Sequence, residues 1–426
     1  MAPAKNDIEW QKIFDKHQIV ETVLAQGRAY ISSTEINLFR EARLMTKFDH
    51  QSQLPEIFVK HKLTILPTSR GGYVIGKMVT FHHFEQSEPK TTRMNFPVEV
   101  ESLDHRDITS ESIAINCAFI AGILHDFMGE SDLYPTVSGR MSSSTFDYTI
   151  DSASGPLKIG VENAQLEIDG GYEGPHSLAI IEAKNYLSSD FLIRQLYYPF
   201  RLWANKIRKK VRPIFLTYTN GLFHLREYAF TDPNHYNSLE LVQQKKYALG
   251  GEQINIETIQ QLLAKTKIVQ EPAVPFPQAN SFARLVNLCE LLKHKEELPK
   301  VDITANYDFD QRQTGYHTNA GKYLGLIAQR KENGQTVFFL TDKGKEILDT
   351  AMVDRQLEFV KLILAHSVFN QILKEYFATG QMASNREIVS VMKLANLYKV
   401  EKEETFNRRA STVKGWINWI LGLIEE

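Results

Sequence analysis

The stretch LEIDGGYEGPHSLAIIEAKNYLSS, residues 166–189, contains two apolar runs, and each run ends in charged residues. The first run ends at Asp169 and the second at Glu182-Ala183-Lys184. Because side chains alternate between the two faces of a strand, Glu182 and Lys184 are expected on the same face. Charged side chains are rarely buried unless they are paired or functional, so this pair marks a candidate site.

The segments around this stretch predict one α/β domain. Short apolar runs separated by Gly, Pro and Ser indicate strands, and Asn220-Gly221 is a typical two-residue hairpin turn. In order, we expect strands at 144–150, 157–171 and 177–185, a helix at 190–210 that Pro199 kinks or splits, and strands at 212–220 and 222–230.

The segments before these strands predict helices and a hairpin. Residues 33–48 begin at a Ser/Thr cap and repeat apolar residues at helical spacing, which predicts one helix. Gly71-Gly72 lies between two alternating runs and predicts a hairpin with a turn longer than two residues. Residues 112–129 are apolar on most sides and predict a buried helix.

The composition is that of an ordinary globular protein with room for two or three domains: 426 residues, 43% hydrophobic and 23% charged. Cys117 and Cys289 lie far apart in apolar helical runs, so we expect two reduced core thiols. The N-terminus lacks the apolar core of a signal peptide, and no run approaches about 18 apolar residues. We therefore expect a cytoplasmic protein with no membrane partner.

Charge is distributed unevenly, although the formal net charge is only −2. Residues 185–250 contain ten Lys and Arg against four acidic residues, a local excess of six positive charges. Such an excess suits a polyanion such as DNA, and a solvated helix face is the plainer alternative. The ten basic residues are Arg194, Arg201, Lys206, Arg208, Lys209, Lys210, Arg212, Arg226, Lys245 and Lys246.

The C-terminal third begins after a proline-rich segment, residues 268–281, which predicts a stiff inter-domain linker. Two later segments resemble one another: RQTGYHTNAGKYLGLI at 312–327 and RASTVKGWINWILGLI at 409–424. Both begin with Arg and end in Leu-Gly-Leu-Ile. Two copies of one module explain the likeness, and a chance match of two apolar helix ends is the alternative.

The first copy has the parts of a winged helix: preceding helices, a turn into the 312–327 helix, then a turn, a strand and a further helix. In helix-turn-helix proteins the second helix enters the major groove by its N-terminal end. The second copy is not expected to form a wing, because the sequence given stops at Glu426. Expected DNA contacts are Arg312, Gln313, Thr314, Tyr316, His317 and Asn319 in the first copy, and Arg408, Arg409, Ser411, Thr412 and Lys414 in the second.

The residue types at the ends of the two central runs suit phosphodiester hydrolysis. That reaction uses a hard divalent cation to polarise a phosphoryl oxygen and to lower the pKa of an attacking water. Mg²⁺ prefers oxygen ligands, so the carboxylates of Asp169 and Glu182 and the carbonyl of Ala183 would form its cradle. Lys184 would hold or activate the water and offset charge that grows on phosphorus.

The arrangement of these residues resembles the signature of the PD-(D/E)XK nuclease superfamily, the fold of most type II restriction endonucleases. Asp169 is followed after twelve residues by Glu182-Ala183-Lys184, each at a predicted strand end. Ile168 replaces the proline that usually precedes the aspartate. An isolated Glu-x-Lys is a weak signal, whereas the upstream aspartate and the strand order make the resemblance specific.

The resemblance extends beyond the motif, over roughly residues 110–235 and more loosely over 281–426. Gln195 and Tyr198, on the next predicted helix, are similar to residues that restriction and recombination nucleases carry there. Gln195 is therefore implied as a further catalytic residue, and Arg194 beside it as a DNA contact. The 312–327 segment also resembles restriction-enzyme sequences.

The resemblance implies a sequence-specific, Mg²⁺-dependent type II restriction endonuclease that cuts double-stranded DNA. The expected fold is α/β (α+β), with a mixed-sheet core of restriction-endonuclease type and a mainly helical C-terminal part of tandem winged-helix-like modules. A homodimer is expected because two active sites cut two strands, and a cognate DNA methyltransferase is a genetic rather than a physical partner. The expected domains are 1–105 for support or DNA contact, 106–267 as nuclease core, 268–280 as linker, and modules at 281–352 and 353–426.

Plainer interpretations and other functions stay open. Asp169 beside two glycines would start a turn, Glu182 and Lys184 would form a surface ion pair on an edge strand, and Gln195 would be solvated. A structure-specific repair or recombination nuclease, or a winged-helix regulator without catalysis, would use the same elements. Candidates for a further metal ligand are Glu111, Asp126, Glu130, Glu162, Gln165 and Glu167.

Overall fold

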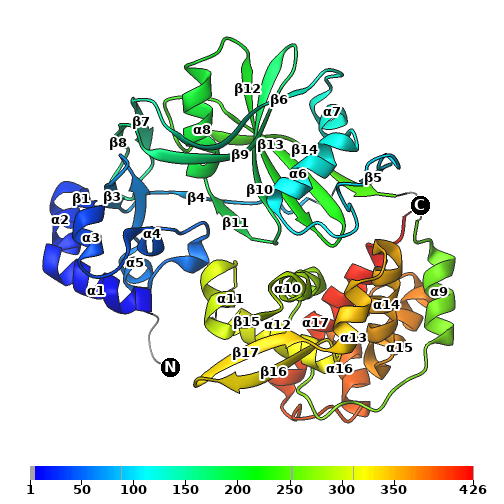
Figure 1. Cartoon of the computed structure of the whole chain (residues 1–426). Coiled ribbons are helices and arrows are strands. Elements are labelled where there is room, and N and C mark those ends of the chain that lie inside the picture. The colour runs from blue at the N-terminus through cyan, green and yellow to red at the C-terminus, as the bar shows by residue number, and fades with distance from the viewer. Residues whose placement is uncertain (1–4, 88, 251–252, 310, 426) are drawn as a thin grey trace. The chain divides into compact units, whose positions relative to one another are not determined.

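The computed structural model describes residues 5–87, 89–250, 253–309 and 311–425 (Figure 1). The chain forms two compact units, Met1–Tyr218 with Leu222–Leu249, and Thr219–Gly221 with Gly250–Glu426. The mixed α/β class expected from the sequence is confirmed. The boundary between the units lies near residue 250 rather than at the predicted linker, so residues 253–267 group with the C-terminal unit.

A mixed seven-stranded sheet forms the centre of the first unit, in the order β5-β14-β13-β12-β10-β9-β6. β10 runs parallel to β12 and antiparallel to β9. Helices α6 and α7 cover one face of the sheet, and α8 covers the other (Figure 1). The central elements are α6 (Glu111–Ile120), α7 (Ile123–Met128), β6 (Tyr134–Ser142), β7 (Phe146–Ile150), β8 (Leu157–Val161), β9 (Gln165–Glu173), β10 (Ser177–Lys184), β11 (Asp190–Leu192), α8 (Arg194–Ala204), β12 (Lys210–Thr219), β13 (Leu222–Phe230) and β14 (Leu239–Leu249).

Strand β10 is apolar along most of its length because it is covered on both faces, as central parallel strands are. Leu178 and Ile180 pack with α8, whereas Ala179 and Ile181 pack with α6 and α7. The sequence SLAIIEAK therefore buries seven of its eight positions, and only Lys184 at its end is partly exposed. This burial places the charged end of the strand against a rigid core.

Left-handed backbone positions divide two elements that we predicted to be continuous. Gly122, with φ of 76°, separates α6 from α7 within the predicted 112–129 helix. Asn163, with φ of 53°, lies between β8 and β9 within the predicted 157–171 strand. Both predictions were wrong because such a conformation ends a helix or a strand. The predicted split at Pro199 is also absent, since α8 continues through it.

The N-terminal part combines helices with a three-stranded sheet, in the order β1-β3-β2. The predicted hairpin is confirmed as β2 and β3. The predicted 33–48 helix begins at a Ser32 capping box but ends early, because the Asn37 side chain accepts the Ala42 N–H. The elements are α1 (Lys5–His17), α2 (Ile19–Gln26), β1 (Arg28–Ser32), α3 (Ser33–Asn37), α4 (Ala42–Met45), η1 (Gln51–Gln53), α5 (Glu56–His61), β2 (Thr64–Pro67), β3 (Gly72–Gly76), β4 (Phe81–His83) and β5 (Thr91–Met94).

Two strands of the N-terminal part join the central domain. β5 pairs with β14 at one edge of the seven-stranded sheet, and β4 pairs with β11 just before α8. The region 1–105 is therefore not a separate domain, contrary to the predicted boundary. β7 and β8, by contrast, form a hairpin outside the central sheet.

The second unit begins with the element order of a winged helix. Three helices, α10, α11 and α12, are accompanied by a three-stranded sheet in the order β15-β17-β16. Residues 353–425 contain four helices and no strand pair, so a second winged helix is not formed there. The elements are α9 (Ile256–Lys265), α10 (Phe282–Lys295), β15 (Glu297–Pro299), α11 (Lys300–Asn306), α12 (Gln311–Tyr323), β16 (Ile327–Glu332), β17 (Gln335–Leu340), α13 (Asp342–Leu348), α14 (Met352–Leu364), α15 (Ser367–Thr379), α16 (Asn385–Leu394) and α17 (Glu403–Leu421).

The proline-rich segment 268–281 is irregular, as predicted, but it packs within the second unit. Phe276 and Ala279 are buried, and the Ala279 carbonyl accepts a hydrogen bond from Trp416 Nε1 over 2.8 Å. Its interpretation as an inter-domain linker was therefore wrong.

Both cysteines are free and buried, and burial raises the pKa of Cys117 to about 11. Among the described helices, none has the length and apolar content needed to cross a bilayer.

Candidate active site

Glu182 and Lys184 lie at the carboxyl end of β10, which has a neighbouring strand on each side. Their side chains are 10% and 12% exposed, and Lys184 Nζ donates a hydrogen bond to Glu182 Oε1 over 2.6 Å. The alternative of a surface ion pair on an edge strand is therefore wrong. Buried ion pairs add little net stability because desolvation is costly, so the pair points to a function.

Asp169 lies beside this pair, on the neighbouring strand β9. The ladder between β9 and β10 ends at the pair of Gly170 with Ile181, and Asp169 lies directly before this paired part of β9. Asp169 Oδ2 accepts the Ala183 backbone N–H over 2.8 Å. Because Asp169 is half-buried inside β9, the turn interpretation is wrong.

Gln195 reaches the same cluster from the first turn of α8. Its Nε2 donates a hydrogen bond to Glu182 Oε1 over 2.6 Å, so it is not a solvated side chain. Its Oε1 is buried and has no hydrogen-bond partner among the described residues. A buried acceptor without a partner is costly, and a ligand or a water in the site would satisfy it.

The cluster contains strongly shifted carboxyl groups and a fixed cation. Burial raises the pKa of Glu182 to about 7. The positive charge of Lys184 acts to lower this pKa, and the negative charge of Asp169 acts to raise it. Burial also raises the pKa of Asp169. For Lys184, burial acts to lower the pKa, but the charges of Glu182 and Asp49 outweigh it and raise the pKa well above its ordinary value. Lys184 is therefore an ammonium at neutral pH, whereas Glu182 titrates near neutrality.

A further carboxylate, Asp49, was missed in the sequence, and the charge of Lys184 acts on it. Its side chain is 15% exposed, and it lies in the loop between α4 and α5. Burial acts to raise the pKa of Asp49, but the charges of Lys184, Lys47, His50 and Arg194 outweigh it and lower the pKa. No motif surrounds Asp49, and only the folded N-terminal part brings it near β10.

Arg194, predicted as a DNA contact, lies beside the same cluster in the first turn of α8. Its guanidinium stacks 5.7 Å from the Tyr198 ring centre, and its charge is among those that lower the pKa of Asp49. Arg194 is half-buried, so it borders the cluster rather than an outer basic face.

The candidates for a further metal ligand separate into near and distant groups. The charges of Glu111 and Glu167 add to the raised pKa of Asp169, so both lie near it. Asp126 bonds to Tyr247 and Lys245 beneath α7, and Glu130 bonds to Ser177 at the other end of β10, so neither lies at the cluster. Glu162 and Gln165 are exposed.

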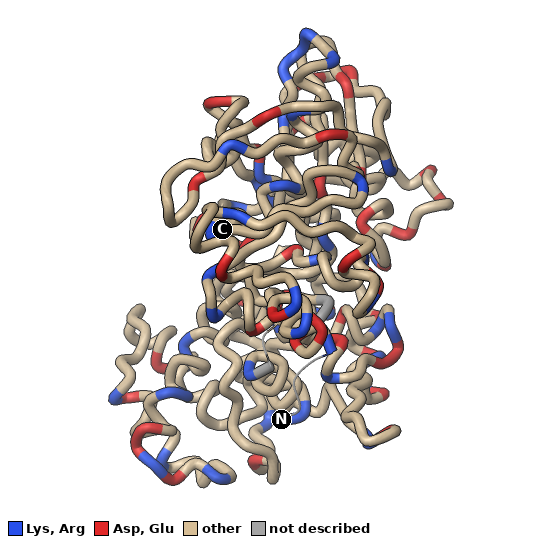
Figure 2. Tube along the Cα trace, turned by 90° about the vertical axis from the view of Figure 1, so that its left-hand side faces the viewer, with Lys and Arg blue, Asp and Glu red and all other residues tan. Residues whose placement is uncertain are grey.

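The basic stretch 185–250 does not form a continuous solvated face. Arg201, Arg212 and Arg226 are buried, and Lys209, Lys210 and Lys245 are paired with carboxylates. Figure 2 shows Lys and Arg interspersed with Asp and Glu along the trace. The buried residues Arg201, Arg212 and Arg226 therefore do not add to an exposed basic flank.

The predicted base-reading residues of the first copy lie on α12, the third helix of the winged-helix part. Arg312 is exposed, and Gln313, Tyr316 and Asn319 are partly exposed. Thr314 and His317 are buried, so the prediction that they contact DNA was wrong. The Thr314 hydroxyl lies 3.1 Å from that of Thr304, and His317 Nδ1 lies 2.9 Å from the Gln313 carbonyl oxygen.

The predicted residues of the second copy lie in the middle of α17, which begins at Glu403. They are therefore not at the end of a helix, where a recognition helix reads bases, contrary to our prediction. Thr412 is fully buried and donates a hydrogen bond to Asn280 Oδ1 over 2.9 Å. Arg408 and Ser411 are exposed, and Arg409 and Lys414 are partly exposed.

The oxygen donors of the cluster fit Mg²⁺. Two carboxylates and one carbonyl suffice for this ion, which usually keeps several waters and binds substrate phosphates. The buried Oε1 of Gln195 adds an acceptor for such a water. Within residues 5–87, 89–250, 253–309 and 311–425, no group of three or more His, Cys, Asp and Glu side chains is arranged to hold a metal ion.

Three segments of the chain match domain families, and each family is described only as a domain of unknown function. They are DUF6996 over residues 7–75, DUF6997 over 76–248 and DUF7226 over 284–425. No curated protein and no solved structure matches the chain. The boundary at residue 248 falls near the end of β14, where the two compact units also separate. The cluster draws Asp169, Glu182, Lys184 and Gln195 from the second segment, and Asp49 lies in the first.

Proposed function

We propose that this protein is a Mg²⁺-dependent endonuclease of type II restriction kind, which hydrolyses phosphodiester bonds in double-stranded DNA. The observation that carries the proposal is the convergence of Asp169, Glu182, Lys184 and Gln195 at the buried end of a central strand. The spacing of these residues resembles the PD-(D/E)XK signature. The mixed sheet with helices on both faces is compatible with that resemblance.

Each residue of the cluster would have its own role in hydrolysis. Asp169, Glu182 and the Ala183 carbonyl would hold Mg²⁺, which polarises a phosphoryl oxygen and lowers the pKa of the attacking water when it is bound. Lys184 is held as an ammonium, so its role is to neutralise charge on phosphorus and to orient the water rather than to act as a base. Gln195 would orient Glu182 through their hydrogen bond.

Sequence recognition is assigned to the winged-helix part. The exposed and partly exposed side chains of Arg312, Gln313 and Tyr316 lie in the N-terminal half of α12, and Asn319 lies just past its middle. Arg and Gln are suited to bidentate contacts with guanine and adenine in the major groove. Arg408, Arg409, Ser411 and Lys414 on α17 would then contact phosphate rather than bases, because they lie within a helix and not at its end.

The remaining parts of the proposal follow from restriction activity. A homodimer would cut both strands with one site in each chain. A cognate DNA methyltransferase would protect the host genome without binding this protein, and both would act in the cytoplasm.

The deciding experiment is digestion of a sequenced plasmid by the purified protein with Mg²⁺ and with excess chelator. We expect discrete bands with Mg²⁺ and none with chelator, and sequencing of the ends gives the recognition site. A Mg²⁺-dependent smear would favour a nuclease that recognises DNA structure or ends. Absence of cleavage on all plasmids tested, with retained DNA binding, would favour a non-catalytic regulator and overturn the proposal.

A further inference from the structure

Arg226 on strand β13 is a buried cation that no carboxylate contacts. The residue is 9% exposed, and no Asp or Glu among the described residues forms an ion pair with it. Its Nε is buried and has no hydrogen-bond partner among those residues. Charged side chains are almost never buried unless they are paired, so this guanidinium lacks an anion.

The hydrogen bond that Arg226 does form goes to a neutral side chain. Nη2 donates to His224 Nδ1 over 2.8 Å, and because arginine can only donate, the proton of the His224 ring lies on Nε2. Burial and the charge of Arg226 lower the pKa of His224 to about 3, so the ring is neutral at neutral pH. Nε2 then donates to Gln244 Oε1 over 2.9 Å, and Gln244 Nε2 donates to Ser87 Oγ. Each donor in this chain points away from Arg226, so the chain brings no negative charge to it.

Glu85 is a carboxylate whose charge acts on Arg226, but other groups hold it. Tyr228 Oη donates to Glu85 Oε2 over 3.1 Å, and His82 Nε2 lies 3.2 Å from Glu85 Oε1. Arg226 instead lies over the Phe84 ring, with Cζ 4.4 Å from the ring centre. A cation–π contact uses the flat face of the guanidinium, so the N–H groups at its edge remain suited to an oxyanion.

Arg226 and the catalytic cluster lie on the same face of the central sheet. Glu182 bonds to Gln195 of α8, and Phe84, which contacts Arg226, belongs to the core between the sheet and α8. The Phe84 ring also lies 5.1 Å from the ring of Phe215, which pairs with Glu182 in the ladder between β10 and β12. β13 is two strands from β10, which is roughly 10 Å. At about 3.4 Å per nucleotide, that distance corresponds to about three nucleotides of a DNA strand.

The side chains next to Arg226 provide a rim that is open to solvent and carries a second cation. Lys246 pairs with His224 in the ladder between β13 and β14 and is partly exposed, and Ser87 is exposed. We propose that Arg226 binds a phosphate group that enters over this rim. We assign that phosphate to the DNA backbone, about three nucleotides from the cleaved bond. The assignment to DNA rests on the proposed function, whereas the phosphate site itself does not.

The first test measures binding of inorganic phosphate by the full-length protein, with Arg226→Met against Arg201→Met. Arg201 is a matched control because it is also buried and lies over a phenylalanine ring, Phe146 at 4.8 Å, but it donates to the Asp147 and Pro233 carbonyls over 3.1 and 2.7 Å. At constant ionic strength set with chloride, we expect phosphate to raise the Tm of the wild type and of Arg201→Met by about 2–4 °C, and not that of Arg226→Met.

Stability without phosphate separates the two arginines further. Arg201→Met leaves carbonyls without their donor and should lower Tm. Arg226→Met removes a buried charge that has no counter-ion, so its Tm should equal or exceed that of the wild type. A lower Tm of Arg226→Met together with an unchanged response to phosphate would show that Arg226 is structural.

The second test measures DNA affinity in Ca²⁺ at several salt concentrations. We expect Arg226→Met to weaken binding about tenfold on every sequence, and to reduce the slope of log K against log salt by about 1, because a phosphate contact is independent of sequence. Arg226→Lys should restore part of the affinity, since it keeps the charge but not the planar fork.

The two probes keep this inference separate from the proposed function. If Arg226→Met responds to phosphate and binds DNA like the wild type, the phosphate site is refuted and the nuclease stands. If the wild type binds inorganic phosphate through Arg226 but neither binds nor cuts DNA, the site stands with a free phosphate as its source, and the nuclease falls. Weaker DNA binding by Arg226→Met with an unchanged salt slope and an unchanged phosphate response would show that Arg226 supports the surface without holding a phosphate.

Discussion

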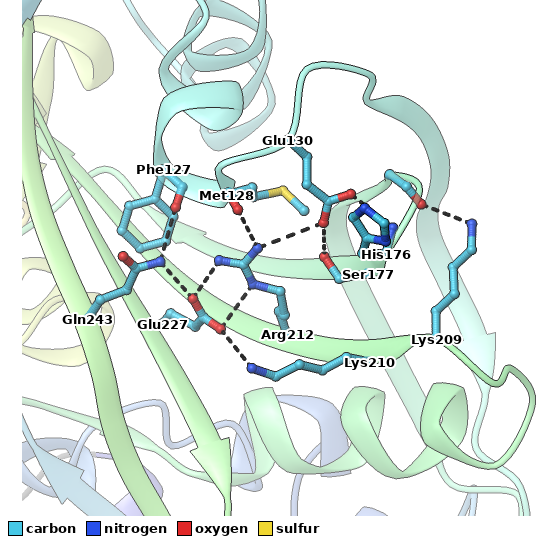
Figure 3. Close-up of polar contacts among 11 residues, drawn as sticks. Phe127, Met128, Glu130, His176, Ser177, Lys209, Lys210, Arg212, Glu227 and Gln243 are labelled. Atoms are coloured by element: carbon cyan, nitrogen blue, oxygen red, sulfur yellow. Dashed lines mark hydrogen bonds and ion pairs between the residues drawn. The ribbon is translucent and has the colours of Figure 1, made fainter.

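The two ends of strand β10 carry buried charges that are arranged in opposite ways. At the amino end, Arg212 donates two hydrogen bonds to Glu227 over 3.0 and 2.7 Å and a third to the Met128 carbonyl over 2.8 Å (Figure 3). Gln243 donates to Glu227, and Ser177 donates to Glu130 (Figure 3). The groups of this cluster satisfy one another. At the carboxyl end, the charges of Glu182, Asp49 and Asp169 all act on the ammonium of Lys184, and a glutamine oxygen has no partner among the described residues.

The pKa values of one acid from each end are shifted in opposite directions. Burial acts to raise the pKa of Glu130, but hydrogen bonds from Ser177 and the His176 backbone, with the charges of His176 and Arg212, outweigh it and lower the pKa. For Glu182, burial raises the pKa to about 7, because the opposing effect of Lys184 is smaller than that of burial. A buried cluster whose charges are matched stabilises the fold, whereas a cluster with an excess of carboxylates has negative charge that a bound cation would neutralise.

The largest effect is expected from removing charges at the carboxyl end. Glu182→Ala and Lys184→Ala should each reduce DNA cleavage about 1,000-fold or more, because each removes a charge that acts on the reacting phosphate. DNA affinity, measured by gel shift in Ca²⁺, should change little. Either variant cutting at the wild-type rate would remove that residue from the mechanism.

Arg212→Ala tests the amino end, where we expect loss of stability rather than of activity. It leaves Glu227 buried with only the exposed Lys210, 3.9 Å away, as a charge partner, which should lower the free energy of unfolding by about 3–5 kcal/mol. Urea denaturation measures this change, and kcat of the folded fraction should equal that of the wild type. The double variant Arg212→Met/Glu227→Leu should recover most of the stability, since apolar groups replace both charges. A large loss of kcat in folded Arg212→Ala would contradict the view that the amino end of β10 serves stability and the carboxyl end serves activity.

The pH dependence of cleavage tests the raised pKa of Glu182. A metal ligand must be deprotonated, and Glu182 is protonated below about pH 7, so the rate at limiting Mg²⁺ should rise with pH through about 7. Below that value we expect about a tenfold loss per pH unit, because the ionised fraction falls tenfold per unit. Higher Mg²⁺ should move the midpoint to lower pH, because the ion competes with the proton. A flat profile from pH 5.5 to 8 would show that Glu182 is not such a ligand.

The sequence predicted the carboxyl end of β10 well for a physical reason. Asp169 lies on β9 and Glu182 and Lys184 lie on β10, the next strand in sequence, so strand order alone brings them close together. Gln195 follows on the next helix. Asp49 is separated from Lys184 by more than a hundred residues, and its loop is joined to the segment after Lys184 only through contacts such as that of the buried His50 with Asp190.

Burial of charged side chains at the amino end, and one strand of the sheet, could not be predicted from local sequence patterns. Arg212 and Arg226 counted toward a basic flank because composition does not show that they are buried. β14 was not predicted because its QQKK sequence lacks an apolar alternation, yet it pairs along its whole length with β13. A strand can thus be defined by its neighbour rather than by its own residues, since backbone hydrogen bonds do not depend on side chains.

The smallest effect is expected at the rim of the amino end, where Lys209, labelled in Figure 3, bonds to Glu173 over 2.6 Å and to the Gly174 carbonyl over 2.9 Å. Both charged side chains are about one third exposed, so water replaces much of what the pair loses. Lys209→Ala should therefore change the free energy of unfolding by only ~0–1 kcal/mol and leave cleavage unchanged. Lys209 directly precedes β12, the strand that carries Arg212. A loss from Lys209→Ala as large as that from Arg212→Ala would therefore mean that location near the start of β12, and not burial of the charge, determines the cost.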